Sequence, residues 1–217
     1  MREHQQDRAS ETRQQIIQGA AVAFDAEGFA GASLGQIVKQ AKTTRGALHF
    51  HFPTKEALAD AVIEEHNRRM TVIVEKVSAT DSSALEQMVM ISEATSRQID
   101  QDSIVRAGTR LVMELTYSGS PPLAYELWIE ACAELIRRGI ADGDIVETVT
   151  PVALATFVIS SLAGIQMVSS VRSGRADLAQ RVDDMWGFLL PGIVPPDRHW
   201  RISQVRSTKW HESVSSP

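Results

Sequence analysis

The sequence contains almost no cysteine, since Cys132 is the only one among 217 residues. A single thiol excludes a disulfide within the chain. With 43% hydrophobic residues, a chain of this length can stabilise one large domain or two small ones by core packing alone. Free cysteine is usually buried in proteins, so the spacing of Cys132 among apolar neighbours predicts an ordinary helix position rather than a reactive thiol. This composition fits a reducing compartment, and we expect a cytoplasmic protein.

The N-terminus lacks an apolar run, because its first ten residues are polar or charged, and no secretory signal peptide is therefore predicted. The later stretch 148–171 has no charged residue and is long enough to cross a bilayer. Its proline, threonine, serine and glutamine residues dilute its hydrophobicity, so we expect no membrane partner. We predict instead a helix buried on most sides, in which Ala153, Ala163 and Gly164 permit close approach of a neighbour.

Sequence signatures of catalysis are also missing. There is no H-E-x-x-H, C-x-x-C or G-x-S-x-G motif and no glycine-rich phosphate loop. His49 and His51 are two residues apart, so on a helix they diverge instead of converging on a metal. His66, beside Glu64 and Glu65, is expected at the surface. We predict no enzyme, no catalytic residue, no metal and no cofactor, and the enzymatic alternative that stays open is a triad of scattered Ser, His and Asp residues.

Acidic residues are absent from one window of an otherwise acidic chain. The net charge is -5, yet residues 39–55 contain four Lys or Arg residues and no Asp or Glu. Local positive charge in an acidic protein predicts a surface for phosphate groups. The alternative is a solvated turn between two packed helices.

The same window contains two short helical patterns separated by a polar break at residues 42–45. Apolar residues at helical spacing are Leu34, Ile37, Val38 and Ala41 in the first pattern, and Leu48 and Phe52 in the second. Ser33 and Thr44 stand where N-cap residues are preferred, and Pro53 ends the second pattern. This arrangement predicts a helix-turn-helix.

Helical periodicity continues along the chain and no strand alternation is convincing, which predicts an all-α fold with about nine helices. The first helix is expected to begin after Ser10 and to end near Gly28, and a long helix is expected near Lys55–Val77. Further helices are predicted near 84–99, 103–115, 122–141, 148–171 and 175–190. We expect a DNA-binding domain at 1–54, a ligand-binding and dimerisation domain at 55–194, and a flexible polar tail at 195–217 that Trp200 and Trp210 could tether.

The residues around the polar break resemble the N-terminal DNA-binding region of TetR-family transcriptional regulators. The matching positions are Ser33, Leu34, Ile37, Val38, Ala41, Thr44, Arg45, Gly46, Ala47, Leu48, Phe50, His51, Phe52, Lys55, Glu56, Ala57 and Leu58. The resemblance covers about residues 11–61 and implies a three-helix DNA-binding head. Two departures are visible: Lys42 and Thr43 replace the usual glycine and apolar residue of the turn, and His49 replaces the usual tyrosine.

The rest of the chain is similar to the γ-butyrolactone receptor branch of that family. The similar segments are 105–111, 128–130, 164–166, 174–178, 185–186 and 190–193. Members of this branch sense small diffusible lactones, furans or butenolides in actinomycetes, and they repress genes for antibiotic biosynthesis or development. Ala163 departs from this pattern, because a threonine is expected there in lactone-sensing relatives.

These resemblances imply a homodimeric repressor that binds a pseudo-palindromic operator and is released by a small signalling molecule. The last two helices of each subunit would form a four-helix bundle. The residues expected to hold phosphates are Lys42, Thr44, His49 and Lys55, and those expected to read bases are Thr43, Arg45 and His51. For the ligand, Trp128 would form an apolar wall, with Gln166, Thr109 and Tyr125 as polar partners.

Other interpretations remain open at this point. Trp128 could be a core or interface residue, and each polar partner could be a buried side chain bonded to the backbone. The effector could be another hydrophobic molecule, such as an antibiotic or a biosynthetic intermediate. A more remote alternative is a helical small-molecule-binding protein or enzyme without DNA binding.

Overall fold

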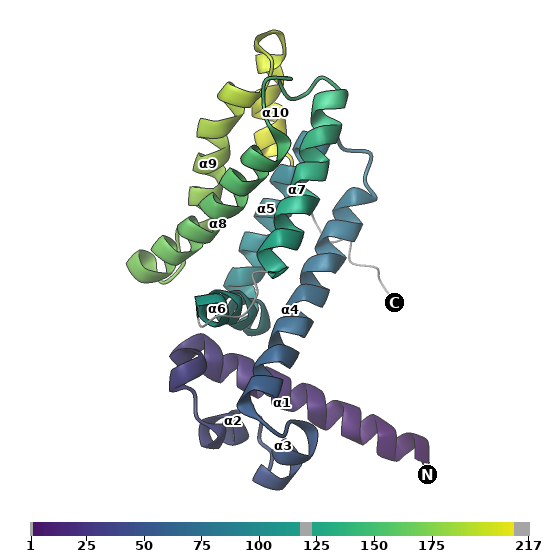
Figure 1. Ribbon diagram of the computed structural model, residues 1–217, viewed down its shortest axis with the longest axis vertical. Coiled ribbons are helices and arrows are strands. Elements are labelled where there is room, and N and C mark those ends of the chain that lie inside the picture. Colours follow the sequence, from purple (N-terminus) through teal and green to yellow (C-terminus); the bar gives the residue numbers. More distant parts are fainter. Residues whose placement is uncertain (1, 118–122, 211–217) are drawn as a thin grey trace. The chain divides into compact units, whose positions relative to one another are not determined.

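The computed structural model describes residues 2–117 and 123–210, with side chains from residues 8–115 and 123–210. Within these ranges all regular elements are helical, which confirms the predicted all-α fold (Figure 1). In chain order they are α1 (Arg2–Gly31), α2 (Leu34–Gln40), α3 (Arg45–His51), α4 (Lys55–Ser78), α5 (Ala84–Gln101), α6 (Ser103–Tyr117), α7 (Leu123–Ala141), α8 (Pro151–Ser173), α9 (Leu178–Ile193), η1 (Pro196–Arg201) and α10 (Ile202–Ser207).

The described chain divides into two compact units. The first, which we call the head unit, contains residues 2–71 and 101–117, and the second, the body unit, contains residues 72–100 and 123–210. The boundary expected at residue 54 therefore lies inside the head unit. The reason is that the first half of α4 contributes buried residues to the core of this unit, and α6, although distant in sequence, packs along α1.

The first helix is longer than expected. It begins at Arg2, and Ser10 is an interior residue rather than its N-cap. Glutamine, arginine, glutamate and alanine are good helix formers, so the residues before Ser10 can continue the helix. Gly28 does adopt positive φ (72°), as a C-terminal glycine would, but the chain resumes helical geometry and α1 ends at Gly31.

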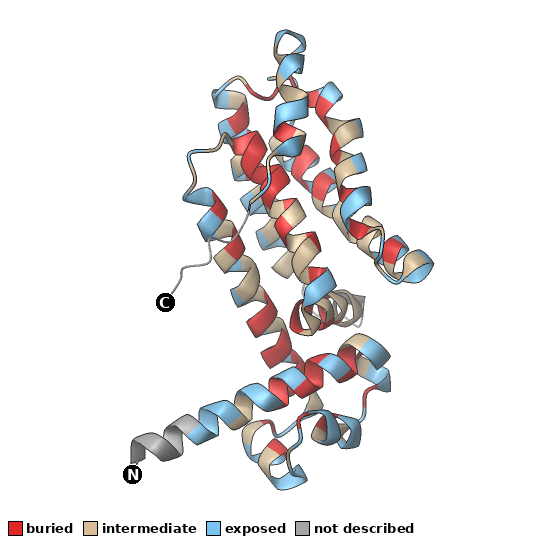
Figure 2. Cartoon of the chain, turned by 180° about the vertical axis from the view of Figure 1, so that it is seen from behind, coloured by how far each residue is buried: buried red, intermediate tan, exposed pale blue. Residues whose placement is uncertain are grey.

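The core of the head unit is built from α1, α2, α3, α6 and the first half of α4. Its largest fully buried side chains are Ile16, Ile17, Phe24, Ile37, Leu48, Leu58, Ile104 and Leu111. Figure 2 shows the buried positions as a stripe along α1. At Gly19 a Cβ atom would lie 2.5 Å from the backbone nitrogen of Ala41. Only a glycine therefore lets α1 and the end of α2 approach this closely.

His66 lies in the interior of the head unit, so its expected surface position is wrong. Its side chain is 2% exposed. A Cβ atom at Gly108 of α6 would come within 2.3 Å of the His66 Cβ, which shows how closely the two helices pack there. Glu64 and Glu65 lie on other faces of α4 than His66. The burial of His66 results from its contact with α6, which the local sequence pattern does not contain.

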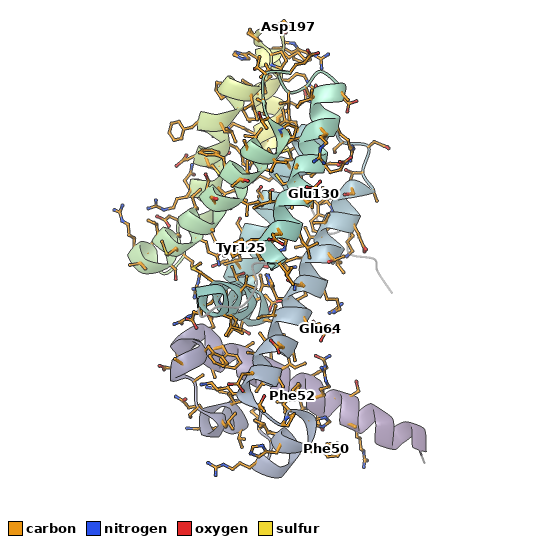
Figure 3. The ribbon with its side chains drawn as sticks, in the orientation of Figure 1. Phe50, Phe52, Glu64, Tyr125, Glu130 and Asp197 are labelled. Atoms are coloured by element: carbon orange, nitrogen blue, oxygen red, sulfur yellow. The ribbon has the colours of Figure 1, made fainter. Side chains whose placement is uncertain are left out.

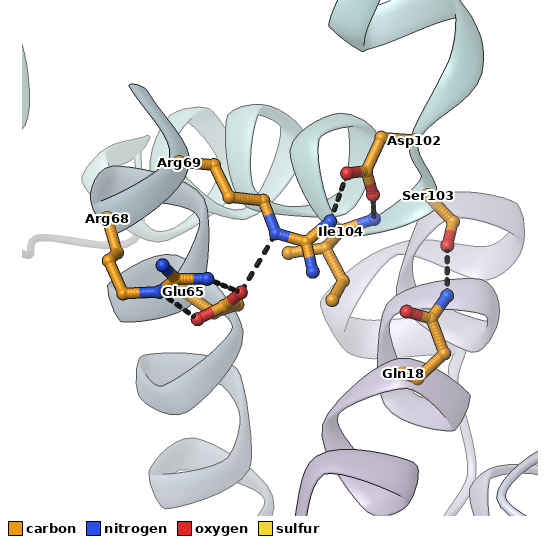
Figure 4. A network of polar contacts seen from close by, with 7 residues as sticks. All are labelled: Gln18, Glu65, Arg68, Arg69, Asp102, Ser103 and Ile104. Atoms are coloured by element: carbon orange, nitrogen blue, oxygen red, sulfur yellow. Dashed lines mark hydrogen bonds and ion pairs between the residues drawn. The ribbon is translucent and has the colours of Figure 1, made fainter. Parts of the chain in front are cut away.

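A network of polar contacts joins α4, α6 and α1 near the start of α6 (Figure 4). Arg69 donates hydrogen bonds to Asp102 and to Glu65. Asp102 in turn accepts the backbone N–H of Ile104 at 2.9 Å, which caps the first turn of α6. The hydrogen bond from Arg68, opposed by burial and aided by Arg69, lowers the pKa of Glu65 to about 2.

The body unit is formed by α5, α7, α8 and α9 with the end of α4. In it α8 packs against both α7 and α9. Its buried side chains include Leu85, Met88, Ile99, Ile136, Ile145, Val158, Val182, Trp186 and Leu190. Trp186, at 1% exposure, is the largest of them.

The segment expected to be a flexible tail is partly helical, since η1 and α10 cover residues 196–207. Val205 is 1% exposed, and Arg206 pairs with Asp183 of α9 at 2.6 Å. Val205 and the pairs that Arg206 forms with Asp183 and Arg198 forms with Asp144 thus connect this polar segment to the rest of the body unit. Residues 211–217 lie outside the described part of the chain.

The two tail tryptophans differ in environment. The Trp210 carbonyl accepts a hydrogen bond from Arg97, and its ring lies 5.9 Å from the Lys76 ammonium. Trp200 is 74% exposed. Trp210 thus contacts α4 and α5 within the body unit, as expected for a tether, whereas the Trp200 ring is mostly exposed.

Helix α8 is long and apolar enough to cross a membrane, but only by length and composition. Just 22% of its most apolar 18-residue window is buried, so the expected burial on most sides is not found in the single chain. Ala153 is exposed, and a Cβ atom at Gly164 would meet nothing within 4 Å. Ala153 and Gly164 are therefore not packed closely against their own chain, whereas Ala163 is half-buried.

The burial of His66 generates a prediction about acid stability. Burial, opposed by Asp102 and aided by Arg69, lowers the pKa of His66 from 6.5 to about 4. Between these values the unfolded chain binds a proton that the native chain does not, so the stability is complete above about pH 6.5 and is lost as the pH falls. We expect the free energy of unfolding to decrease by on the order of 3 kcal/mol over this window through His66 alone.

Urea unfolding at pH 7 and pH 4.5 measures this effect, with His66→Leu as the comparison because it retains the volume without the titrating group. The variant should lose less stability on acidification than the wild type. An equal loss in both proteins would show that other groups cause it.

Candidate DNA-binding surface and ligand site

The turn between α2 and α3 begins with a C-terminal capping motif of α2 in which a lysine takes the left-handed position. Ala41 is the C-cap of α2, and Lys42 follows it in the left-handed region with φ of 49°. The Lys42 N–H bonds to the Lys39 carbonyl at 3.3 Å, and the Thr43 N–H bonds to the Val38 carbonyl at 3.2 Å. These are the two hydrogen bonds of a Schellman motif, whose left-handed residue is usually glycine.

Side-chain caps fix where both helices begin. The Ser33 hydroxyl accepts the Gln36 N–H, and the Gln36 side chain accepts the Ser33 N–H, which forms a capping box at α2. The Thr44 hydroxyl accepts the Ala47 N–H at 3.1 Å and caps α3. The predicted helix-turn-helix is therefore confirmed.

The residues expected to contact DNA lie together on this motif but differ in exposure. Lys42, Thr44, Arg45 and His49 are exposed, whereas Thr43, His51 and Lys55 are half-buried. The His51 ring contacts Phe50 edge-on at a centroid distance of 5.1 Å and also lies near Phe52. Because α3 carries its buried side chains at Leu48 and, just beyond its end, Phe52, the positions of His49 and Phe50 between them face solvent.

Phe50 belongs to this surface although sequence reasoning gave it no role. Its side chain is 81% exposed on α3 (Figure 3). Water does not favour a large apolar ring on a short surface helix, and such positions often mark contact sites. The signal was available, since Phe50 is an apolar residue halfway between two core positions, on the opposite side of the helix.

Lys55 is held at the first position of α4 by two contacts within the head unit. Its ammonium lies 4.9 Å from the centroid of the Phe29 ring and donates a hydrogen bond to the Ala30 carbonyl at 3.3 Å. The Thr54 hydroxyl accepts the Ala57 N–H at 3.1 Å and caps the same helix. A cation next to the backbone N–H groups of a helix start is an arrangement suited to an anion.

The residues expected to bind a ligand are distributed over both units. On α7, Tyr125 and Trp128 are half-buried and form an edge-to-face pair with ring centroids 5.3 Å apart. Gln166 lies on α8, which packs against α7. Thr109 belongs to the head unit, where its hydroxyl donates to the Val105 carbonyl at 2.8 Å.

Cys132 and the potential metal ligands were the remaining candidates for a reactive or metal-binding site. Burial raises the pKa of the half-buried Cys132 thiol to about 11, so it is not a thiolate at neutral pH. No group of three His, Cys, Asp or Glu side chains that could hold a metal is found among the residues that the structure describes.

Two family descriptions match the chain. Residues 16–62 match "Bacterial regulatory proteins, tetR family", and residues 82–195 match "Tetracyclin repressor-like, C-terminal domain". This chain belongs to the TetR family. The proteins of this family that the chain resembles are described as transcriptional regulators, which agrees with the prediction that the chain is not an enzyme.

Several TetR-family proteins are similar over nearly the whole chain. The A-factor receptor protein of Streptomyces griseus is 37% identical over 191 residues, which cover 88% of this chain and 67% of the relative. A crystal structure described as a γ-butyrolactone receptor (ArpA-like protein) has a TM-score of 0.80 at 28% identity, covering 92% and 96% of the two chains. CprB from Streptomyces coelicolor, in complex with its biological operator sequence, has a TM-score of 0.81 at 27% identity, covering 92% and 98%. The predicted resemblance to the γ-butyrolactone receptor branch is thus confirmed.

The left-handed lysine of the TetR-family turn generates a stability prediction. A non-glycine residue in this region costs about 1–2 kcal/mol, and glycine costs about 0.5–1 kcal/mol in chain entropy. We therefore expect Lys42→Gly to stabilise the protein by about 0.5–1 kcal/mol in urea unfolding. Lys39→Gly removes the same charge from a helical position of α2 and should destabilise by about 1 kcal/mol. Equal destabilisation by both variants would contradict the turn geometry.

Proposed function

We propose that this TetR-family protein is a repressor that binds pseudo-palindromic operator DNA as a homodimer and is released by a small signalling molecule of the γ-butyrolactone, butenolide or furan type. The observation that carries the proposal is the exposed surface around α3. It presents Arg45, His49 and Phe50 to solvent within a window that lacks acidic residues. Similarity over 88% of the chain to an A-factor receptor protein supports the same function.

The chemistry of the exposed groups suggests which of them would contact phosphates and which would contact bases. Lys42 and Lys55 are cations at the edges of α3, and His49 and the Thr44 hydroxyl can donate to phosphate oxygens while Thr44 still caps the helix. Arg45, at the first position of α3, can donate two hydrogen bonds to guanine.

The remaining positions on α3 and its turn would read base edges. Thr43 offers a hydroxyl and a methyl group, and His51 is held against Phe50 so that the two rings present one surface. An exposed phenyl ring suits the methyl group of thymine. We therefore add Phe50 to the base-reading residues expected from the sequence.

An exposed apolar face on α8 and α9 supports dimerisation. Its members are Val152, Phe157, Met167, Val168 and Val171 on α8 and Phe188 on α9. Large apolar side chains of this number are rarely left in water, and a second copy of the same face would bury them in a four-helix bundle. Dimers of this kind place two reading helices in successive major grooves about 34–36 Å apart.

The body unit supplies the proposed effector site. Trp128 and Tyr125 provide an apolar wall with one indole N–H and one hydroxyl, and Gln166 provides an amide. Ala163 lacks the hydroxyl of a threonine, so it favours an effector with fewer hydrogen-bonding groups at that point. This observation supports, as a second candidate, a repressor that responds to another hydrophobic effector such as an antibiotic or an intermediate.

The effector would act because its binding and the binding of operator DNA are thermodynamically linked. It can lower the operator affinity only if it binds the DNA-incompetent arrangement more tightly, with a coupling of typically about 1–3 kcal/mol. A similar solved structure is described as the molecular basis for control of antibiotic production by bacterial hormones. By analogy, the regulated genes would serve antibiotic biosynthesis or development, and the protein would act in the cytoplasm.

The DNA-binding roles can be tested with a duplex enriched from a random-sequence pool by the wild-type protein. Arg45→Ala should cost about 1–3 kcal/mol on this duplex and relax the preference over a scrambled duplex, because it removes a base contact. Lys55→Ala should weaken binding to both duplexes alike, because it removes a phosphate contact. It should also lower the slope of log affinity against log salt concentration, the salt slope, by about one unit. Fluorescence anisotropy at several salt concentrations measures both effects.

Arg137→Ala is the control for these variants, because it removes one exposed positive charge from α7 in the body unit. It should leave both the preference and the salt slope unchanged. Wild-type affinity in Arg45→Ala and Lys55→Ala together would refute the assigned surface.

The proposed dimer face can be tested by Phe188→Asp. This side chain is 87% exposed in the single chain, so the substitution should not disturb the fold but should place charges inside the dimer. Sedimentation velocity should show a shift from dimer to monomer. Trp200→Asp, at a residue 74% exposed on η1 and outside the proposed face, should remain dimeric. A dimer in both variants would place the interface elsewhere.

A further inference from the structure

A break in the hydrogen bonding of α1 lies next to the DNA-binding motif. Gly28 has φ of 72° and ψ of 179°, far from helical values, while the chain on both sides is helical. In a regular helix the Phe29 N–H would bond to the Asp25 carbonyl. The rotation at Gly28 turns the Phe29 N–H out of that direction, so both groups require other partners.

An ion pair on α6 supplies both partners. Glu114 accepts the Phe29 N–H through Oε2 at 2.6 Å, and Arg110 donates from Nη1 to the Asp25 carbonyl at 2.7 Å. The two side chains also bond to each other, with Arg110 Nε 2.6 Å from Glu114 Oε1. The pair thus stands in for one helical hydrogen bond of α1, with a charged group at each end.

The backbone contacts give this ion pair a structural role that its exposure alone would not suggest. The Arg110 and Glu114 side chains are 40% and 33% exposed, and ion pairs of that kind usually contribute little to stability. Hydrogen bonds from charged groups to the backbone are shorter and stronger than neutral ones. Arg106, one turn earlier on α6, adds a bond from Nε to the Asp25 carboxylate at 2.7 Å.

The backbone at the break admits essentially only glycine, because other residues rarely adopt φ of 72° with ψ of 179°. A Cβ atom at Gly28 would lie 2.6 Å from Glu114 Oε1 and 2.7 Å from Arg110 Nη2. The kink in α1 and the ion pair on α6 therefore fit one another directly, within a single compact unit of the protein.

The residues that follow the kink hold Lys55. The Phe29 ring stacks on Phe24 with centroids 6.1 Å apart, and its face lies 4.9 Å from the Lys55 ammonium. The same ammonium donates to the Ala30 carbonyl at 3.3 Å. The position of the Lys55 ammonium thus depends on the backbone at residues 29 and 30. Glu114 holds this backbone in place by accepting the Phe29 N–H.

We propose that Glu114 and Arg110 are positioning residues for DNA binding, which hold the kink of α1 and through Phe29 and Ala30 place the Lys55 ammonium for a phosphate contact. The proposal rests on the DNA-binding function proposed above. It adds to that function two side chains on a helix outside the helix-turn-helix.

The test is a double-variant cycle on the duplex enriched by the wild-type protein. Glu114→Ala should weaken binding about threefold to tenfold and lower the salt slope by up to about one unit, as expected when one phosphate contact is lost. Because Glu114 acts through Lys55, adding Glu114→Ala to Lys55→Ala should cause no further loss. Glu114→Gln keeps an oxygen that accepts the Phe29 N–H and should bind more tightly than Glu114→Ala.

Glu134→Ala is the matched control. Glu134 forms an exposed ion pair with Arg137 on α7, so the variant loses the same charge and the same kind of pair in the body unit. It should not weaken binding. Hydrogen exchange of the peptide covering residues 25–32 should be faster in Glu114→Ala than in Glu134→Ala, and circular dichroism of Glu114→Gln checks that the fold is intact.

The outcomes separate this proposal from the function on which it rests. Loss of affinity in Glu114→Ala that disappears in the Lys55→Ala background supports the positioning role. Wild-type affinity in Glu114→Ala, or equal losses in both backgrounds, overturns it while DNA binding stands. If the wild-type protein shows no preference for the enriched duplex over a scrambled one, the proposed function fails, and this proposal fails with it.

Discussion

The burial of one face of α1 is the interaction on which the rest of the head unit depends. Ile16, Ile17 and Phe24 are essentially inaccessible to water, and α2, α3 and α6 all pack against this helix. At about 25 cal/mol per Å² of apolar surface, burying such a side chain stabilises the fold by roughly 1.5–3 kcal/mol. A surface of charged side chains cannot fold alone, so the position of α3 follows from this core. The side chains proposed to contact DNA are therefore positioned by apolar packing on the opposite, buried faces of the same helices.

Polar contacts then determine details that apolar packing leaves open. Hydrophobic burial is not directional, whereas each buried N–H and C=O group requires a partner at a defined place. The kink at Gly28 and its partners on α6 specify how the chain leaves α1, and the network around Asp102 specifies where α6 begins. These few contacts join α6, which lies far from the helix-turn-helix in the sequence, to the region that approaches DNA in the proposed function.

Local patterns made much of the fold predictable. Ser33 and Thr44 cap their helices through partners three residues away, so the sequence alone contains both the cap and its partner. The burial of His66 depends on a distant segment, and the expectation of a surface position was wrong for that reason. The helices η1 and α10 at residues 196–207 likewise contact distant segments, which a local pattern does not contain. Lys42 shows a third case, because its left-handed conformation is imposed by the hydrogen bonds of the turn although its side chain does not favour it. The sequence shows that Phe50 is an apolar residue outside the spacing of the core positions. Its exposure in the structure is what indicates a role in binding.

The central claim is that two copies of α3 read an operator with two-fold symmetry. Hydroxyl-radical footprinting of the wild-type protein on its enriched duplex tests this claim most directly, since it reports which sugars the protein covers. The account predicts two protected patches, related by a two-fold axis and lying on the same side of the duplex, with centres about one helical turn, or 34–36 Å, apart. A single protected patch, or protection spread evenly along the duplex, would contradict it.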